Sequence, residues 1–146
     1  MASHSDAPTT GRTLQCVVVT PERAVLDTAA DSVVLPMYDG ELGVLPGRAP
    51  FIGRLGYGEM RIRRGAETRR YFVDGGFGQV RANVVTVLTP RAIPKEQIDA
   101  AAATRALEAA RAPAAAPEEQ AARAKAQERA RAQLRLARRG QGEAHA

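Results

Sequence analysis

The sequence predicts a mainly β fold with an α-helical tail, because the character of the chain changes near Pro94. Before Pro94, short apolar runs rich in β-branched residues are separated by Gly and Pro, which is the pattern of strands joined by tight turns. After Pro94, Ala and Arg dominate and no glycine occurs until Gly140, which favours helices. A chain of 146 residues is long enough for one compact domain with an appendage.

The apolar runs of the first part are spaced as in a β-sandwich or a β-barrel. Met60 and Ile62 alternate with charged neighbours, which predicts a strand with one buried and one solvated face. The segment 65–68 should join this strand to the next as a hairpin. Cys16 is the only cysteine, so it is expected to be a buried core residue without a disulfide partner. Strands are predicted at 14–20, 24–26, 32–38, 43–46, 59–63, 70–73 and 83–88.

A first helix is predicted from Pro94 to about Ala112. Proline tolerates the first turn of a helix, and the carboxylates of Glu96 and Asp99 complement the exposed N–H groups there. The proline-bounded segment 113–117 should interrupt the helix. A second helix that begins at this break would return antiparallel to the first.

The second helix is predicted from Pro117 to about Arg139, just before Gly140. One stripe of this helix is apolar but narrow and built from small side chains. Its burial should stabilise docking by only a few kcal/mol at about 25 cal/mol per Å², so the hairpin is expected to detach readily. The apolar stripe consists of Ala122, Ala126, Ala130, Leu134 and Ala137, and its neighbour of Arg123, Gln127, Arg131, Arg135 and Arg139.

These predictions divide the chain into four parts: a disordered tail at 1–11, a β domain at 12–93, a helix-turn-helix domain at 94–139 and a disordered tail at 140–146. The first segment lacks the apolar run of a signal peptide. No apolar run approaches the roughly 18 residues that are needed to span a bilayer.

No group of residues in the sequence predicts a catalytic or metal site. The two histidines, His4 and His145, lie near the chain ends, and Cys/His spacings typical of metal sites are missing. Gly75 and Gly76 lack the strand-to-helix context of a dinucleotide-binding motif, and no Gly-Lys-Ser/Thr follows any glycine pair. We therefore expect a protein without enzymatic activity or cofactor.

The formal net charge of +5 leaves one alternative open, a basic β-barrel that binds nucleic acid. A single-strand binder also needs stacking aromatic side chains among its charges, and only Tyr71 and Phe72 lie nearby in the sequence. We therefore expect no nucleic-acid partner. The arginines that could follow phosphates are Arg61, Arg63, Arg64, Arg69 and Arg70.

Three segments occur in a characteristic order: GELGVLPGRAPF at 40–51, FVDGGFGQV at 72–80 and NVVTVL at 83–88, followed by the predicted hairpin. Together they resemble the epsilon subunit family of bacterial-type rotary proton-translocating ATP synthases, over about residues 12–139. The resemblance implies a flattened, ten-stranded N-terminal β-sandwich followed by a C-terminal antiparallel helical hairpin. It also implies a non-catalytic subunit of the central stalk that rotates with the motor.

The resemblance implies the partners as well. They are the gamma subunit, the membrane rotor ring of c subunits, and the alpha and beta subunits when the hairpin extends and blocks ATP hydrolysis. The complex would lie at the cytoplasmic face of the bacterial inner membrane, which this chain would contact only indirectly. Glu41 and Arg48 match a loop, 39–48, that faces the rotor ring. The basic helix face that meets acidic residues of the beta subunit corresponds to Arg131, Arg135 and Arg139.

The chain departs from the family pattern at three places. Arg48 stands where the family often has His, and Gln79 where it often has Glu. Some members bind a regulatory ATP through an Ile/Leu-Asp-x-x-Arg-Ala motif, but here Ile98 and Asp99 are followed by Ala102 at the arginine position. We therefore assign no nucleotide-binding residues.

Overall fold

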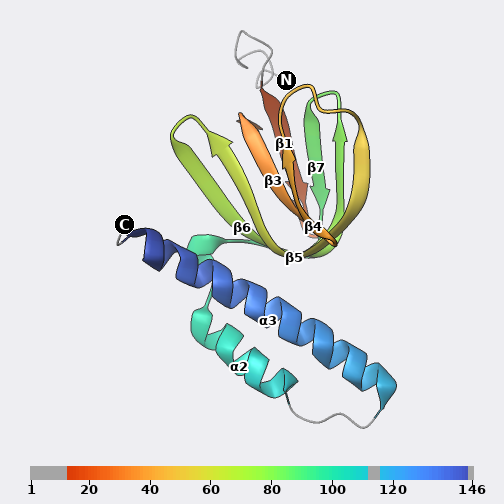
Figure 1. Cartoon of the computed structure of the whole chain (residues 1–146), viewed down its shortest axis with the longest axis vertical. Coiled ribbons are helices and arrows are strands. Elements are labelled where there is room, and N and C mark those ends of the chain that lie inside the picture. The colour runs from red at the N-terminus through yellow and green to blue at the C-terminus, as the bar shows by residue number, and fades with distance from the viewer. Residues whose placement is uncertain (1–12, 112–115, 145–146) are drawn as a thin grey trace.

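The computed structural model describes residues 13–111 and 116–144. The tail predicted at 1–11 and the last two residues of the tail predicted at 140–146 lie outside this part. A β domain sits above two helices, and α3 runs directly beneath it (Figure 1). The described strands are β1 (Leu14–Val19), β2 (Ala24–Ala30), β3 (Ser32–Met37), β4 (Gly40–Val44), β5 (Phe51–Arg64), β6 (Glu67–Arg81), β7 (Val84–Leu88) and β8 (Ala92–Pro94).

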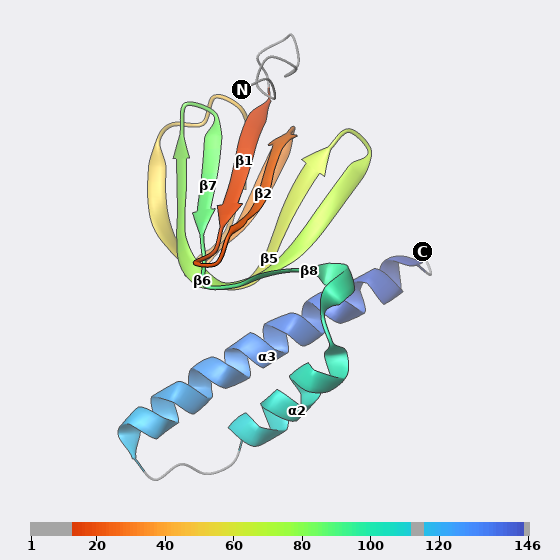
Figure 2. The same cartoon turned by 180° about the vertical axis from the view of Figure 1, so that it is seen from behind.

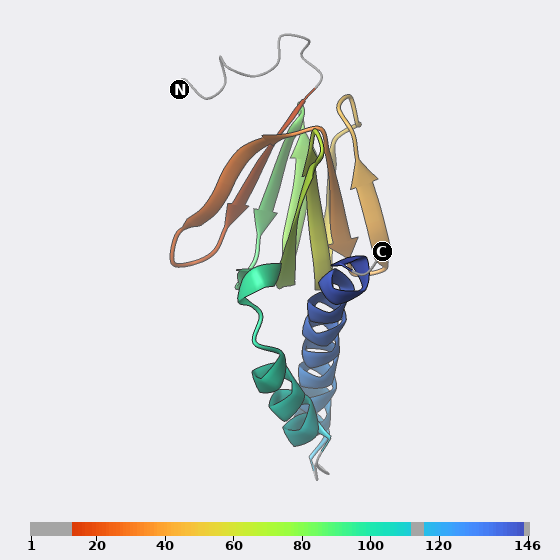
Figure 3. The ribbon, with the colours of Figure 1, turned by 90° about the vertical axis from the view of Figure 1, so that its left-hand side faces the viewer.

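The strands form a β-sandwich in which β5 and β6 belong to both layers (Figures 1 and 3). The order is β2-β1-β7-β6-β5-β3-β4, with β8 added to β6. The second half of β6 pairs with β7, and the second half of β5 pairs with β3. Because β5 and β6 each contribute to both layers, the eight strands described are enough to build the sandwich. The resemblance implied ten separate strands.

The bend that carries β6 from one layer to the other depends on Gly75 and Gly76, whose φ angles are +78° and +104°. A Cβ on Gly76 would lie 2.0 Å from the carbonyl oxygen of Leu88, so only glycine fits there. The pairing passes from Leu55 opposite Gly76 to Tyr57 opposite Asp74. The bend therefore brings Tyr57 and Asp74 to the end of the sandwich that faces the helices.

The main core lies between the two layers and is built mostly from Val, Leu, Ile and Met side chains. Cys16 is fully buried in it, as predicted. The hairpin predicted at 65–68 is also confirmed, since Arg64 pairs with Glu67 across the turn. The strands predicted at 59–63 and 70–73 are much shorter than β5 and β6, because the glycines of these strands were interpreted as turn residues. Inside β5, glycine instead allows close packing: a Cβ on Gly53 or Gly58 would lie within 3 Å of Met37 or Pro36, respectively.

The first helix does not begin at Pro94, which is the last residue of β8. A short 3-10 helix, η1 (Lys95–Gln97), follows, and α2 spans Ala100–Ala110. The side chain of Asp99 caps α2 by accepting a hydrogen bond of 3.0 Å from the Ala102 N–H. The capping carboxylate, not the proline, sets the start of this helix.

The second helix, α3, spans Pro117–Ala144, so the predicted end at Arg139 is wrong. One glycine costs a helix only about 1 kcal/mol, and Gly140 does not stop this one. The two helices form the predicted antiparallel pair, with α2 packed on the side of α3 that faces away from the sandwich (Figure 2). Arg123 and Gln127 of α3 donate hydrogen bonds to the carbonyl oxygens of Ala109 and Ala110 at the end of α2.

Candidate functional site

The hairpin docks on the sandwich through a second apolar face of α3 that the sequence analysis missed. Ala132 and Leu136 cover Phe72, which is fully buried. Tyr57, Ile93 and Ile98 pack around this contact. Truncating such a contact typically costs a few kcal/mol, so the docked position is specific.

The predicted apolar stripe is only partly correct. Ala130 and Leu134 are buried against Ala103 and Leu107 of α2, so this stripe holds the hairpin together instead of docking it on the sandwich. Ala122 is exposed and Ala126 and Ala137 are half-buried. Ala132 and Leu136, which are buried beneath the sandwich, lie two residues after Ala130 and Leu134, respectively, which face α2. Apolar residues at this spacing indicate a helix that is covered on two sides.

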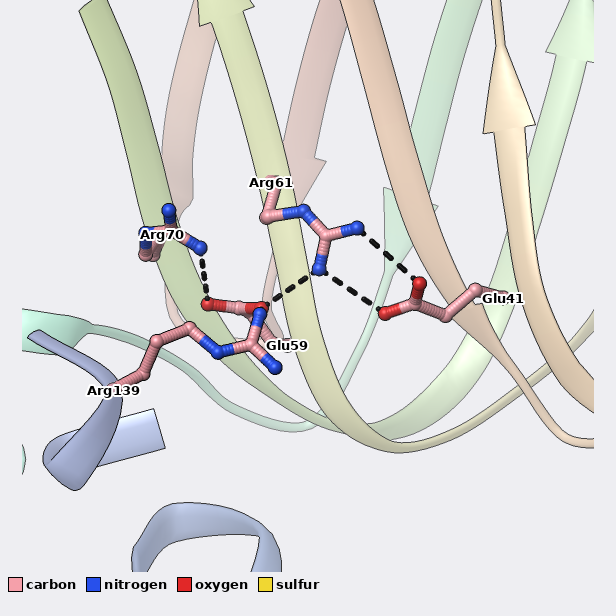
Figure 4. Close-up of polar contacts among 5 residues, drawn as sticks. All are labelled: Glu41, Glu59, Arg61, Arg70 and Arg139. Atoms are coloured by element: carbon pink, nitrogen blue, oxygen red, sulfur yellow. Dashed lines mark hydrogen bonds and ion pairs between the residues drawn. The ribbon is translucent and has the colours of Figure 1, made fainter. Parts of the chain in front are cut away.

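A cluster of charged residues surrounds Glu59 where α3 meets the sandwich (Figure 4). The Glu59 side chain is only 9% exposed, and it accepts hydrogen bonds from Arg61 of β5 at 2.8 Å, Arg70 of β6 at 3.0 Å and Arg139 of α3. Arg61 also donates to both carboxylate oxygens of Glu41, at 3.1 and 3.2 Å. These acceptors raise the pKa of Arg61, with the hydrogen bond to Glu41 as the largest cause.

A second ion pair joins α3 to the sandwich. Nε of Arg129 donates a hydrogen bond of 2.6 Å to Asp74, whose side chain is nearly buried. The hydrogen bond to Asp74 is the main reason that the pKa of Arg129 is raised. No pattern in the sequence around Arg129 indicates this carboxylate partner. The sequence could not show that β6 supplies one across the docking interface.

The three arginines predicted to meet the beta subunit have different environments. Arg139 is paired with Glu59, whereas Arg131 and Arg135 are exposed. Arg135 and Arg139 line a cavity of about 210 Å³ together with Glu41 and Glu59. Arg131 and Arg135 border a second, more open cleft between α2 and α3.

The two residues predicted to meet the rotor ring do not share one loop, because residues 40–44 form β4. Glu41 lies near the start of β4 and borders the cavity beside α3. Arg48 lies beyond the other end of this strand, which runs away from the hairpin (Figure 3), and its guanidinium is 5.9 Å from the Phe51 ring centroid. The turn before Arg48 is held by a 2.7 Å hydrogen bond from the Gly47 N–H to the Asn83 side chain.

An exposed apolar surface, which the sequence analysis also missed, lies on the layer that contains β7. Ile52, Phe77 and Leu88 are 69%, 55% and 51% exposed, respectively. Phe77 lies opposite Leu88 on one side and opposite Arg54 on the other. The Arg54 guanidinium stacks over Tyr38 at 4.4 Å from the ring centroid. The sequence signal was β7 itself, which has apolar residues at both alternating sets of positions and so cannot have a fully polar outer face.

The basic surface expected of a nucleic-acid-binding protein is largely neutralised. Of the five arginines predicted to be able to follow phosphates, Arg61 and Arg70 pair with Glu59, and Arg69 lies 3.9 Å from Glu67. Phosphate binding depends on cationic side chains that are available to the backbone of the nucleic acid. The geometry therefore does not favour the nucleic-acid alternative.

In ranges 13–111 and 116–144, no group of three or more His, Cys, Asp or Glu residues is arranged to hold a metal ion. His4 and His145 lie outside these ranges. No helix in the same ranges has the length and apolar character that crossing a membrane requires.

Comparison with known proteins places the chain in a family. The model for the ATP synthase delta/epsilon chain β-sandwich domain matches residues 13–95. The ATP synthase epsilon chain of Rhodopirellula baltica is 55% identical over 126 residues, which cover 86% of this chain and 98% of that protein. The epsilon chain of a Synechococcus species is 42% identical over 98 residues, 67% of this chain and 72% of its own length.

Solved structures share the fold at low sequence identity. A chain in the Euglena gracilis mitochondrial ATP synthase superposes with a TM-score of 0.68 at 24% identity, covering 96% of this chain and 86% of its own. A chain in the Tetrahymena thermophila mitochondrial ATP synthase central stalk and c-ring gives 0.67 at 13% identity, covering 85% and 96%. The fold, the family model and the relatives agree: this chain belongs to the ATP synthase epsilon chain family.

Proposed function

We propose that this chain is the epsilon subunit of a rotary ATP synthase, a non-catalytic part of the central stalk. In this role it links the gamma subunit to the membrane rotor ring and restrains ATP hydrolysis through its hairpin. The observation that carries the proposal is the 55% identity to the Rhodopirellula baltica protein over 98% of that protein. An alignment of 126 residues must extend beyond the sandwich into the hairpin, to which the proposal gives the regulatory role.

The exposed apolar surface supports binding to the gamma subunit. Adjoining large apolar side chains are uncommon on the surface of a protein that works alone. Ile52, Phe77 and Leu88 come from three neighbouring strands. Arg54, which lies opposite Phe77, lines a cavity of about 530 Å³ together with Tyr38. We assign this surface to the gamma subunit, because it lies on the rigid sandwich and not on the hairpin that must move.

The edge strand β4 supports contact with the rotor ring. It is the last strand in the sheet order, so one edge of its backbone pairs with no other strand of the described residues. Glu41 and Arg48 lie toward opposite ends of β4, and a partner that lies along this edge can reach both. In the complex this edge would face the ring at the cytoplasmic side of the bacterial inner membrane, without direct contact between this chain and lipid.

The hairpin supports a regulatory role because its arginines can exchange partners. Arg139 pairs with Glu59 when α3 is docked. In an extended state, Arg131, Arg135 and Arg139 would meet acidic residues of the beta subunit, while the alpha subunit contacts the same hairpin. A partner subunit can shift the equilibrium between the docked and the extended hairpin only through contacts that differ between these two states. The exchange of Glu59 for a beta-subunit residue by Arg139 would be such a difference.

Co-purification with the gamma subunit of the same organism tests the proposal. The parent chain should elute with gamma as a stoichiometric complex, and Ile52→Ser together with Phe77→Ser should weaken that complex. Leu45→Ser is the matched control, because it removes a side chain that is 61% exposed but lies on a turn outside the apolar surface. Failure of the parent chain to bind gamma would overturn the proposal. Equal weakening by the control would refute the assignment of the surface.

A further inference from the structure

The Glu59 cluster connects the β4 edge to the hairpin through shared hydrogen-bond acceptors. Arg61 and Arg139 both donate to the same carboxylate oxygen, Oε1 of Glu59, whereas Arg70 donates to Oε2. Arg61 divides its hydrogen bonds between Glu59 and Glu41. The four side chains Glu41, Arg61, Glu59 and Arg139 therefore form one continuous chain from an exposed strand edge to α3 (Figure 4).

We propose that Glu41 controls the docking of the hairpin by setting how strongly Arg61 competes with Arg139 for Glu59. While Glu41 holds Arg61, the charge of Arg61 is shared between two carboxylates and Glu59 can accept Arg139. When a cationic group of a partner engages Glu41, Arg61 turns its full charge to Glu59. Three guanidinium groups then face one carboxylate, and the repulsion displaces the least enclosed of them.

Exposure identifies the arginine that leaves. The side chain of Arg139 is 45% exposed, against 25% for Arg61 and 18% for Arg70. Arg61 and Arg70 also lie on paired strands that cannot separate without breaking the sheet, whereas α3 can lift away. The event at Glu41 is therefore expected to release the part of α3 that contains Arg139.

The second ion pair limits how far the release extends. Arg129 binds Asp74 and lies over Tyr57, and neither of these belongs to the Glu59 cluster. Loss of Arg139 from Glu59 should therefore loosen residues 131–139 first and leave residues 117–128 almost unchanged. If Glu41 contacts the rotor ring, as the proposed function has it, this coupling lets contact at the ring influence the hairpin, but the coupling itself is a property of the isolated chain.

Hydrogen exchange of the isolated full-length chain, measured by mass spectrometry, tests the inference without any partner subunit. Glu41→Gln should speed amide exchange at residues 131–139 by about threefold, and Glu59→Gln by about tenfold. Arg139→Gln should speed the same region, and adding Glu41→Gln to it should have no further effect. Exchange in β7 (84–88) should stay unchanged in every variant, which shows that the sandwich remains folded.

Arg61→Gln separates competition from simple structural support. Removing this competitor leaves Oε1 of Glu59 to Arg139, so exchange at residues 131–139 should become slower than in the parent chain. A merely structural role of Arg61 would give faster exchange. Arg138→Gln, which neutralises an exposed neighbour outside the cluster, is the matched control and should change nothing.

Faster exchange in Arg61→Gln, or additive effects of Glu41→Gln and Arg139→Gln, would overturn the inference. Because no other subunit takes part, these outcomes leave the proposed function untouched. Conversely, failure to bind the gamma subunit would leave this result intact.

Discussion

The guanidinium of Arg129 lies over the ring of Tyr57, 5.0 Å from its centroid, while its Nε donates a hydrogen bond to Asp74. Tyr57 and Asp74 are opposite each other on β5 and β6, next to the glycine bend. The bend that folds the sheet into two layers therefore also builds the surface that receives α3. Docking of the hairpin depends on the architecture of the sandwich as much as on the helix.

Asp74→Asn should weaken docking of the hairpin. The change removes the charge that Arg129 pairs with but keeps the size of the side chain, and a hydrogen bond to a charged group contributes about 1.5–3 kcal/mol. We expect faster hydrogen exchange at residues 117–130, which is the part of α3 around Arg129 and before it. In an assembled ATP synthase, a hairpin that inhibits when extended should then lower the rate of ATP hydrolysis. Unchanged exchange in this segment would show that Phe72 alone holds α3.

The sequence predicted the parts of the fold that depend on local pattern. The change of composition near Pro94, the alternation around Met60 and Ile62 and the break at 113–117 are all visible along the chain. The family resemblance further predicted the two-layer sandwich, which alternation alone did not distinguish from a barrel.

The docking interface could not be predicted in the same way, because it depends on contacts between distant residues. Nothing local shows that Glu59 lies beside Arg139 or that Phe72 is covered by Leu136, since these pairs meet only after β5 and β6 have bent. The glycines that allow the bend were taken for turns, which hid the length of both strands. A charged strand residue such as Glu59, or an apolar one such as Phe72, is compatible with many partners, so only the structure identifies the residues that they contact.

The sandwich should fold without the hairpin, but with an exposed Phe72. Truncation after Pro94 keeps β8 paired with β6 and leaves intact the main core, which contains no residue of α2 or α3. It removes Ala132 and Leu136 from above Phe72. We expect cooperative unfolding, together with increased binding of a hydrophobic dye that Phe72→Ser in the truncated chain reverses. Loss of the near-ultraviolet circular dichroism signal in the truncated chain would contradict independent folding.

Ala82→Gly should stabilise the protein. Ala82 and Asn83 have φ angles of 51° and 64° in the two-residue turn between β6 and β7, and the left-handed region costs a non-glycine residue about 1 kcal/mol. Urea unfolding should show a gain of about this size. Ala66→Gly in the other two-residue hairpin turn is the control, because Gly65 takes the positive φ there and the change should bring no gain. Equal effects of the two substitutions would argue against strain at Ala82.

The stability of the fold should fall at alkaline pH partly because of Cys16. Burial, helped by the negative charge of Asp27, raises the pKa of the thiol to about 12, against about 8.5 in an unfolded chain. The stabilisation from the neutral thiol is fully present below the unfolded pKa and is lost as the pH rises toward the folded pKa. Urea unfolding between pH 8 and 11 should therefore show a steeper loss for the parent than for Cys16→Ala. Parallel curves would contradict this. Because burial keeps the Cys16 thiol neutral in the folded protein, thiol reagents should react with it very slowly at pH 8.

Arg131 and Arg135 should promote inhibition of ATP hydrolysis, while Arg139 should have two opposing effects. Arg131 and Arg135 are exposed when the hairpin is docked, so under the proposed function replacing both with Ala should weaken only the contacts that they would make to the beta subunit in the extended state. Hydrolysis by the assembled complex should rise by about threefold to tenfold at low ionic strength, and added salt should reproduce part of the rise by screening.

Arg139→Ala should raise hydrolysis less, because it also removes the ion pair with Glu59 that favours the docked state. Arg105→Ala, an exposed arginine of α2, is the control. If the double variant and the parent hydrolyse ATP at the same rate at low ionic strength, these arginines form only a solvated helix face and contribute nothing to inhibition.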